Sequence, residues 1–169
     1  ICLDKIMAYA AEHQSELAEK NKALVYGALS HGINNITSSS MGRLFDAVSA
    51  LLGIKEYNDY EGQCAIMLED AAARRETEAE KLAYDFHMKV AQSVLEQCIN
   101  VRNETGINKA VLSGGVFQNR ILTEKCLKLL RDNNFEVYCN ISVSPNDGGI
   151  ALGQSYIGMK ILEERRNGN

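Results

Sequence analysis

The residues best suited to chemistry gather in Val111–Arg120, which reads Val-Leu-Ser-Gly-Gly-Val-Phe-Gln-Asn-Arg. This pattern is that of a short buried strand that runs into two glycines and then into an amphipathic helix. The amides of Gly114, Gly115 and Val116 can approach an oxyanion closely, and the N-terminus of a helix favours negative charge. The segment therefore predicts a site for a phosphorylated ligand, although most Gly-Gly turns of this kind only reverse the chain.

Two aspartates are further candidates. Asp147 lies in Pro145–Gly149, where a strand has ended and a helix of small residues begins, so its carboxylate is expected at a helix N-terminus. The ordinary role of an aspartate in that place is to cap the helix. Asp46 follows Gly42 by four residues on a predicted helix, where a solvated carboxylate paired with Arg43 is the ordinary expectation.

Hydrophobic periodicity predicts an α/β architecture with a mainly helical first two-thirds. Strand, glycine turn, helix and strand then follow, which is the pattern of a βαβ unit with parallel strands. Thr37–Ser40 supply N-cap oxygens for a helix that Gly53 ends, and Gly106 breaks a longer helix. His87 lies beside the apolar stripe of that longer helix and is expected to be a packing or hydrogen-bonding residue. The expected helices span residues 1–20, 23–32, 41–52, 63–74, 78–103, 119–133 and 147–165, and the strands span residues 109–113 and 136–139.

Composition is that of a folded globular protein and disfavours several functions. Of 169 residues, 46% are hydrophobic and 24% are charged. The net charge of −4 disfavours a nucleic-acid surface, and no apolar run is long enough to span a membrane. The five scattered cysteines form no C-x-x-C pair, which indicates reduced thiols in a cytoplasmic protein. The start Ile-Cys-Leu-Asp has no initiator methionine and suggests a chain cut from a longer one.

Four motifs in order carry a family resemblance: Ser38–Val48, Tyr60–Gln63, Ser113–Asn119 and Ser144–Gly153. Over residues 30 to 160 the chain resembles the C-terminal part of the hydrogenase-maturation carbamoyltransferases, the HypF family. More distantly it is similar to the TsaD-type threonylcarbamoyl transferases of tRNA modification. Both belong to the actin, hexokinase and sugar-kinase (ASKHA) superfamily of two-lobed ATP-binding folds.

The resemblance implies one helix-rich lobe of that two-lobed fold, with a small, mostly parallel sheet and a glycine loop between strand and helix. Residues 1–169 would form a single domain, with a helical lead-in over 1–35 and the motif-bearing lobe over 36–160. The segment between Glu69 and Leu82 is shorter than the family pattern, so a strand or a hairpin is expected to be missing.

The resemblance also implies a nucleotide site for ATP with Mg²⁺. Gly114 and Gly115 would lie at the phosphates, and Asp46 would accept the hydroxyls of the ribose. Gly62 would let the backbone pass close to the sugar or base. Asn119 would either cap its helix or hydrogen-bond the adenosine, because an amide offers both a donor and an acceptor. Glu69 is a further, weaker candidate.

Asp147 matches an aspartate that binds a divalent metal, zinc or iron, together with histidines of the other lobe. The family is similar to enzymes that convert carbamoyl phosphate and ATP into carbamoyl adenylate and release pyrophosphate. The carbamoyl group then passes to the C-terminal cysteine of the partner maturase HypE and becomes the cyanide ligand of [NiFe]-hydrogenase. Since the other lobe and the upstream domains lie outside this sequence, the chain alone is expected to be inactive.

Two alternatives stay open. The chain could be a lobe of a TsaD-like transferase or a sugar kinase, although Phe117-Gln118 and Pro-Asn-Asp-Gly-Gly favour the first assignment. It could instead be a non-catalytic interaction module. Its exposed inter-lobe face would then bind a partner or a second copy of the chain, because removal of one lobe uncovers apolar surface.

Overall fold

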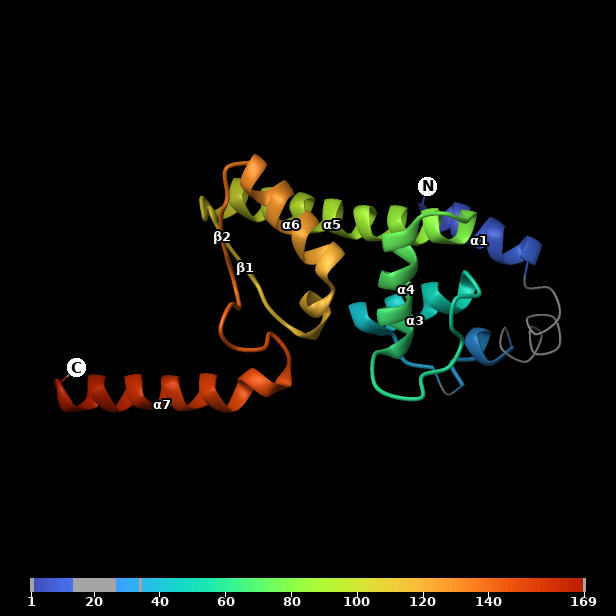
Figure 1. Cartoon of the computed structure of the whole chain (residues 1–169). Helices are drawn as coiled ribbons and strands as arrows, with labels where there is room; N and C mark the ends of the chain where they lie inside the picture. Colours follow the sequence, from blue (N-terminus) through green and yellow to red (C-terminus); the bar gives the residue numbers. More distant parts are fainter. Residues whose placement is uncertain (1, 14–26, 34, 169) are drawn as a thin grey trace. The chain divides into compact units, whose positions relative to one another are not determined.

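The computed structural model describes residues 2–13, 27–33 and 35–168. The chain divides into two compact units, Ile1–Gln92 and Ser93–Asn169, which we call the first and the second unit and describe separately. The helices of the first unit are α1 (Cys2–His13), α3 (Met41–Leu51), α4 (Gln63–Arg74) and the beginning of α5 (Glu78–Thr105), as Figure 1 shows.

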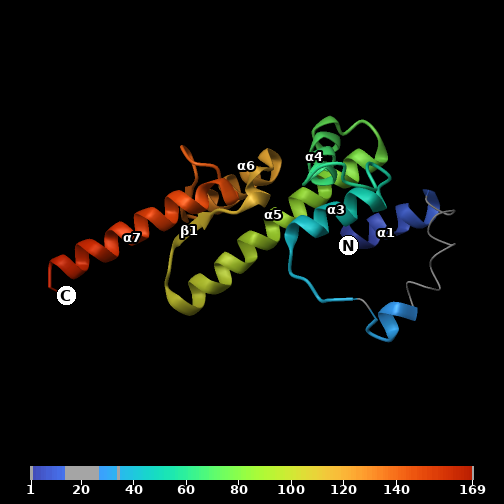
Figure 2. The same ribbon diagram turned by 90° about the horizontal axis from the view of Figure 1, so that it is seen from below.

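The core of the first unit lies between α3 and its neighbours. Helix α3 packs against α4 and α1, and α3 and α4 lie side by side in Figure 2. Phe45 is 1% exposed, and its ring meets Phe86 and His87 of α5 edge to face, with centroids 5.0 and 5.1 Å away. This cluster fixes α3, which carries Asp46 next to Phe45. The other buried apolar side chains of the unit include Ile6, Val48, Leu52, Leu68, Ala72, Ala83 and Ala91.

Most predicted helix ends in this part of the chain are confirmed. The Ser40 hydroxyl accepts a hydrogen bond from the Arg43 amide (3.4 Å), and Gly53 and Gly106 follow α3 and α5 with φ of 66° and 75°. Helix α5 runs two residues beyond its predicted end. Of the two helices predicted before residue 33, the structure contains α1 and a helical turn at 27–30, and residues 14–26 lie outside the described residues.

The turn between α4 and α5 is held by a local network that the sequence reasoning missed. Both oxygens of Glu80 take part. Oε1 accepts from the Arg74 guanidinium (2.6 Å), and Oε2 accepts from the amides of Glu76 (2.9 Å) and Thr77 (3.1 Å). The Thr77 hydroxyl accepts in turn from the Glu80 amide (3.3 Å), which completes a capping box for α5. The polar residues 74–80 predict either a solvated turn or a helix start. Helix α5 does start here, at Glu78, but Glu80 is only 9% exposed.

His87 is buried in the core, as predicted. Nδ1 donates to the Ala83 carbonyl (2.7 Å), which fixes the proton on that nitrogen, and the residue is 0% exposed. Burial lowers the pKa of His87 below its ordinary value, although the bond to Ala83 opposes the shift. The folded state therefore keeps this ring neutral at pH values where the unfolded chain binds a proton.

The first unit should consequently lose stability as the pH falls from about 7.5 to about 5.5, because the unfolded state then binds more protons. Replacement His87→Gln keeps an amide donor and should remove this part of the pH dependence. The free energy of unfolding, measured in urea across this range, checks the slope. Leu68→Ala, which retains His87, should lower the free energy at every pH and leave the slope unchanged. Equal slopes in wild type and His87→Gln would contradict the assignment of this pH dependence to His87.

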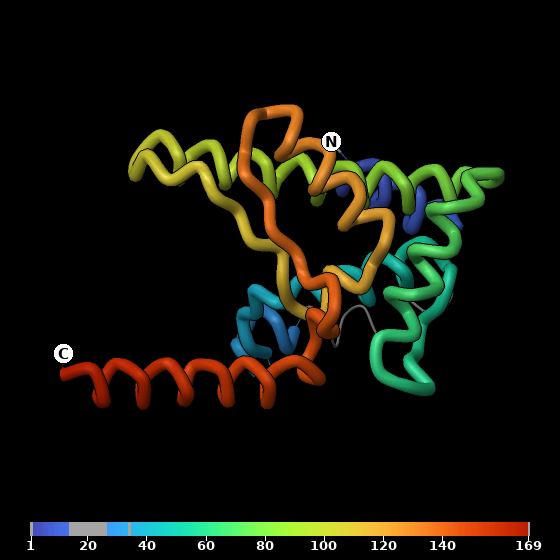
Figure 3. The backbone as a smooth tube through the Cα atoms, turned by 60° about the vertical axis from the view of Figure 1, so that its left-hand side comes forward, coloured from blue at the N-terminus to red at the C-terminus, as the bar shows by residue number. Residues whose placement is uncertain are grey.

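The second unit is built on two parallel strands, β1 (Lys109–Leu112) and β2 (Glu136–Cys139), with Lys109 opposite Glu136 and Leu112 opposite Cys139. The helix between them, α6 (Arg120–Asp132), covers one face of the sheet. Figure 3 shows the strands running side by side next to this helix. The arrangement confirms the predicted α/β class with a small parallel sheet. The buried apolar side chains of this unit include Leu95, Ala110, Leu112, Leu122, Cys126, Leu130 and Phe135.

The last helix, α7 (Ile150–Arg166), has no buried residue and packs mainly against the 3₁₀ turn η2 (Asp147–Gly149). We predicted one helix from 147 to 165, but its first turn is the separate turn η2. Although α7 is rich in apolar residues, no helix in the described part of the chain is long and apolar enough to cross a membrane.

All five cysteines are free thiols. Cys64 and Cys126 are buried, and the others are half-buried. Burial raises the pKa of Cys126 to about 11, with a smaller contribution from nearby Cys98, so this thiol stays protonated and unreactive at neutral pH.

Candidate functional site

Two of the sequence motifs meet at the carboxyl ends of the strands. The segment after β1, Ser113–Gln118, is the glycine loop, and the segment after β2, Ser144–Gly149, is the aspartate loop. The Gly114 amide donates to the Pro145 carbonyl (2.9 Å), and a Cβ on Gly115 would lie 3.9 Å from the Asn146 Cβ. Loops that follow parallel strands at the same edge of a sheet are the usual place of a ligand site in α/β folds.

The glycine loop differs from its prediction in one respect. Gly114 has φ of 101°, which only glycine adopts readily, and its amide is occupied by Pro145. Of the three amides expected to face an oxyanion, those of Gly115 and Val116 remain without an acceptor in the described part of the chain. They belong to the first turn of a 3₁₀ helix, η1 (Gly115–Gln118), whose first amides have no partner within the helix.

The α-helix itself begins one turn later than the glycines. Helix α6 starts at Arg120, and Asn119 is its N-cap, with Oδ1 accepting from the Leu122 amide (2.9 Å). The capping role left open for Asn119 is thus confirmed, and a contact to adenosine stays a prediction. Because η1 lies between Gly114 and α6, the positive end of the α6 dipole is not at the two glycines as expected.

Asp147 is exposed, and it is not the cap of the following turn. Asn146 takes that role, since its Oδ1 accepts from the Gly148 amide (3.0 Å). The capping alternative for Asp147 was therefore wrong. The Asp147 carboxylate suits a divalent metal, but among the described residues no three His, Cys, Asp or Glu side chains are grouped so that they could hold one. Asp147 could supply a single ligand to such a metal, and its role as a metal ligand stays a prediction.

Asp46 lies in the first unit and departs from the expectation of a solvated carboxylate. It is half-buried, and its Oδ1 is buried with no hydrogen-bond partner among the described residues. Among the described residues, Asp46 and Arg43 form no ion pair with each other. Burial raises the pKa of the Cys64 thiol, and the charge of Asp46 raises it further, so the carboxylate lies near the first turn of α4. A buried acceptor without a donor is the arrangement that a bound hydroxyl would complete.

Gly62 stands immediately before α4 with φ of 79°, so it serves as a turn glycine, and its close approach to a sugar or base stays a prediction. In the first turn of α4, the Cys64 amide donates to the Asn58 side chain (2.7 Å). Glu69 is half-buried farther along the same helix. The structure thus brings Asp46 close to the turn at Gly62, while Gly114, Gly115, Asn119 and Asp147 belong to the second unit.

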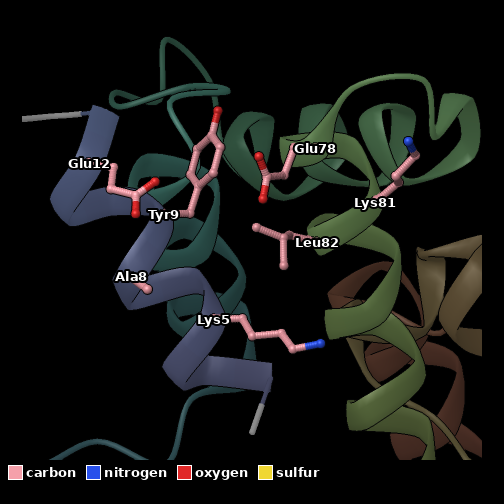
Figure 4. A pocket seen from close by; sticks show the side chains of 7 residues that line it. All are labelled: Lys5, Ala8, Tyr9, Glu12, Glu78, Lys81 and Leu82. Carbon is pink, nitrogen blue, oxygen red and sulfur yellow. The ribbon is translucent and has the colours of Figure 1, made fainter.

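The first unit also contains a hollow of about 450 Å³ (Figure 4). Tyr9 and Glu12 of α1 face Glu78 and Leu82 of α5 across it. None of the predicted site residues lines it, and the charged side chains of its lining are exposed and of both signs. It carries no functional assignment.

The features above define a class of protein. A helix-rich α/β chain, with a glycine loop and an aspartate loop meeting at the carboxyl ends of parallel strands, has the architecture of one lobe of an actin/hexokinase-like fold. The family model described as "Carbamoyltransferase, Kae1-like Domain, second subdomain" matches residues 2–80 and 72–154. The chain belongs to this family, the HypF carbamoyltransferases.

Individual relatives agree with the family. The probable carbamoyltransferase HypF of Methanocaldococcus jannaschii is 29% identical over 81% of this chain and 22% of its own length. The carbamoyltransferase HypF of Synechocystis sp. is 31% identical over 69% of this chain and 19% of its own. A crystal structure of full-length HypF, in a phosphate- and nucleotide-bound form, matches with a TM-score of 0.78 and 33% identity over 92% of this chain and 25% of that one. The chain spans about a fifth of the length of these curated relatives.

Proposed function

We propose that this chain is the nucleotide-binding part of a carbamoyltransferase that uses carbamoyl phosphate and ATP to form carbamoyl adenylate. The carbamoyl group would pass to the C-terminal cysteine of a HypE-like maturase, for the cyanide ligand of [NiFe]-hydrogenase. The observation that carries the proposal is the bond between Gly114 and Pro145, which holds the glycine loop against the aspartate loop. The free thiols support a cytoplasmic location.

The residues fit ATP through two kinds of contact. The Gly115 and Val116 amides can donate to phosphate oxygens, and oriented backbone donors stabilise negative charge without reorganising. The Asp46 carboxylate, with its buried acceptor atom, can accept from the hydroxyls of a ribose. When bound, ATP supplies the adenylyl group that activates the carbamoyl carbonyl toward a thiolate. The two sets of residues belong to separate units, and the variants below test Asp46 of the first unit and Asn119 of the second.

Binding of ATP with Mg²⁺, measured by isothermal titration calorimetry, tests the proposal. Asp46→Ala should weaken binding about tenfold or more, since a hydrogen bond to a charged group contributes about 1.5–3 kcal/mol. Asn119→Ser tests the predicted adenosine contact, because serine still caps α6 while the amide is lost. The matched control Gly153→Ala lies on α7, where a Cβ meets nothing within 4 Å, and should bind as wild type does.

Identical titrations for wild type and Asp46→Ala would overturn the ribose contact, and an absence of heat with wild type would overturn nucleotide binding by this chain. Carbamoyl transfer to a HypE-like C-terminal cysteine should be undetectable with the chain alone. The reaction needs water excluded around both substrates, which one lobe does not achieve.

A further inference from the structure

The second unit exposes an apolar surface that its own residues do not cover. On β1, Val111 is 70% exposed on the face opposite α6, and on β2 Tyr138 is 46% exposed. Parallel sheets are normally covered on both faces. The large apolar side chains of α7 are all exposed: Ile150, Leu152, Tyr156, Ile157, Met159, Ile161 and Leu162.

Helix α7 has the pattern of a buried helix. At 100° per residue, Ile150, Ile157 and Ile161 fall on one side of α7, and Leu152 and Met159 fall on the opposite side. A helix that is apolar on opposite sides packs between two layers of a protein. Here α7 packs mainly against η2. Another polypeptide segment is therefore needed to cover it.

The comparisons indicate how long that segment is. The alignment with the Methanocaldococcus relative extends over 167 positions. It contains only 81% of the 169 residues of this chain, which is about 137 residues. The relative thus has about 30 residues with no counterpart here. The Synechocystis relative gives a similar difference. Its alignment extends over 145 positions and contains 69% of this chain, which is about 117 residues. The two segments matched by the family model overlap at residues 72–80, which places the gap at the turn between α4 and α5.

The free edge of β1 offers a place for such a segment to pair. The Glu136 amide donates to the Asn108 carbonyl, so in this register residues 108, 110 and 112 bond to β2. The amides and carbonyls of Lys109 and Val111 point to the other edge. A sheet of two strands is small beside the usual five or six, and about 30 residues suffice for a hairpin of two strands of ordinary length.

We propose that the outer edge of β1 and the apolar side chains of α7 form a docking surface for a strand-forming segment of about 30 residues. The relatives of this protein carry such a segment within their own chain, and here a second polypeptide would supply it. The main-chain groups of Lys109 and Val111 pair with its edge strand, and the apolar side chains of α7 pack on its face. This is strand addition, in which backbone hydrogen bonds give affinity and side chains give specificity.

The probe is a synthetic peptide with the sequence of the unmatched residues of the Methanocaldococcus relative, labelled with fluorescein. Its anisotropy should rise saturably with added chain, and a scrambled peptide should not bind. Amide exchange at Lys109 and Val111, followed by NMR, should slow at least tenfold in the complex. Val111→Pro removes one edge donor and should weaken binding at least tenfold, whereas Val111→Ala keeps that donor and should bind nearly as wild type.

Ile157→Glu on α7 is a second test that leaves β1 unchanged, and it should also weaken binding at least tenfold. The proposal fails if the peptide does not bind, or if neither Val111→Pro nor Ile157→Glu alters binding. It also fails if light scattering shows a dimer that Ile157→Glu dissociates and the peptide does not, because a second copy would then occupy the surface. None of these results depends on nucleotide binding.

Discussion

Replacing Phe45 with alanine should destabilise the first unit by about 3–5 kcal/mol, the usual cost of removing a buried aromatic ring. Phe45 is 1% exposed and contacts the rings of Phe86 and His87, so α5 cannot easily close the cavity. Hydrogen exchange of α3 and α4 measures the effect within the first unit. The exchange should accelerate by two orders of magnitude or more, as that free-energy change implies.

Tyr57, which is 70% exposed in the loop before α4, provides the control. Tyr57→Ala should change stability by no more than about 0.5 kcal/mol. If Phe45→Ala cost less than about 1 kcal/mol, the ring cluster would not be the centre of this core. Because Asp46 is the next residue on α3, Phe45→Ala should also weaken any ligand contact made by Asp46. Measurements of binding therefore need a variant that is still folded.

Replacing Gly149 with alanine should open the aspartate loop. A Cβ at this position would lie 2.7 Å from the Ser144 carbonyl oxygen and 3.1 Å from a methyl group of Val143. The nearest atom belongs to the backbone, so the loop must shift, at a cost of about 1–3 kcal/mol for overpacking. The Pro145 carbonyl lies in this loop, and the amide exchange of Gly114, which donates to it, should accelerate.

Gly153→Ala is the matched control for this experiment, because it adds the same methyl group where nothing lies within 4 Å. Alanine favours a helix over glycine by about 1 kcal/mol, so α7 should become slightly more stable. Exchange at Gly114 should stay as in wild type. If Gly149→Ala left that exchange unchanged, the contact between the two loops would not depend on the shape of the aspartate loop.

The sequence predicted the elements well where a local signal defines them. Ser40 caps α3 and Gly53 and Gly106 follow helices, because N-capping and a positive φ depend on only a few neighbouring residues. The strand, glycine loop, helix and strand of the second unit are also local patterns. The family follows from motifs in order, which the comparisons confirm.

The details of the candidate site could not be predicted in the same way. Gly114 and Pro145 are 31 residues apart, and only the fold shows that the amide of the first is occupied. Asn146 and Asp147 are adjacent and are both good caps, and backbone geometry selects Asn146. The buried oxygen of Asp46 depends on the packing of α4 against α3, which periodicity does not specify. The nucleotide and metal roles of these residues stay predictions.

The hydrogen bonds around Glu80 make the junction of α4 and α5 a place where the chain should tolerate an insertion. Thr77 and Glu80 both stand on the α5 side, so their reciprocal capping bonds would survive if foreign sequence were grafted between Arg75 and Glu76. Of the bonds that Glu80 makes to the described residues named above, the one from Arg74 crosses that point, and the one from the Glu76 amide does not. A reporter domain or new chain termini could be introduced there while the start of α5 stays capped.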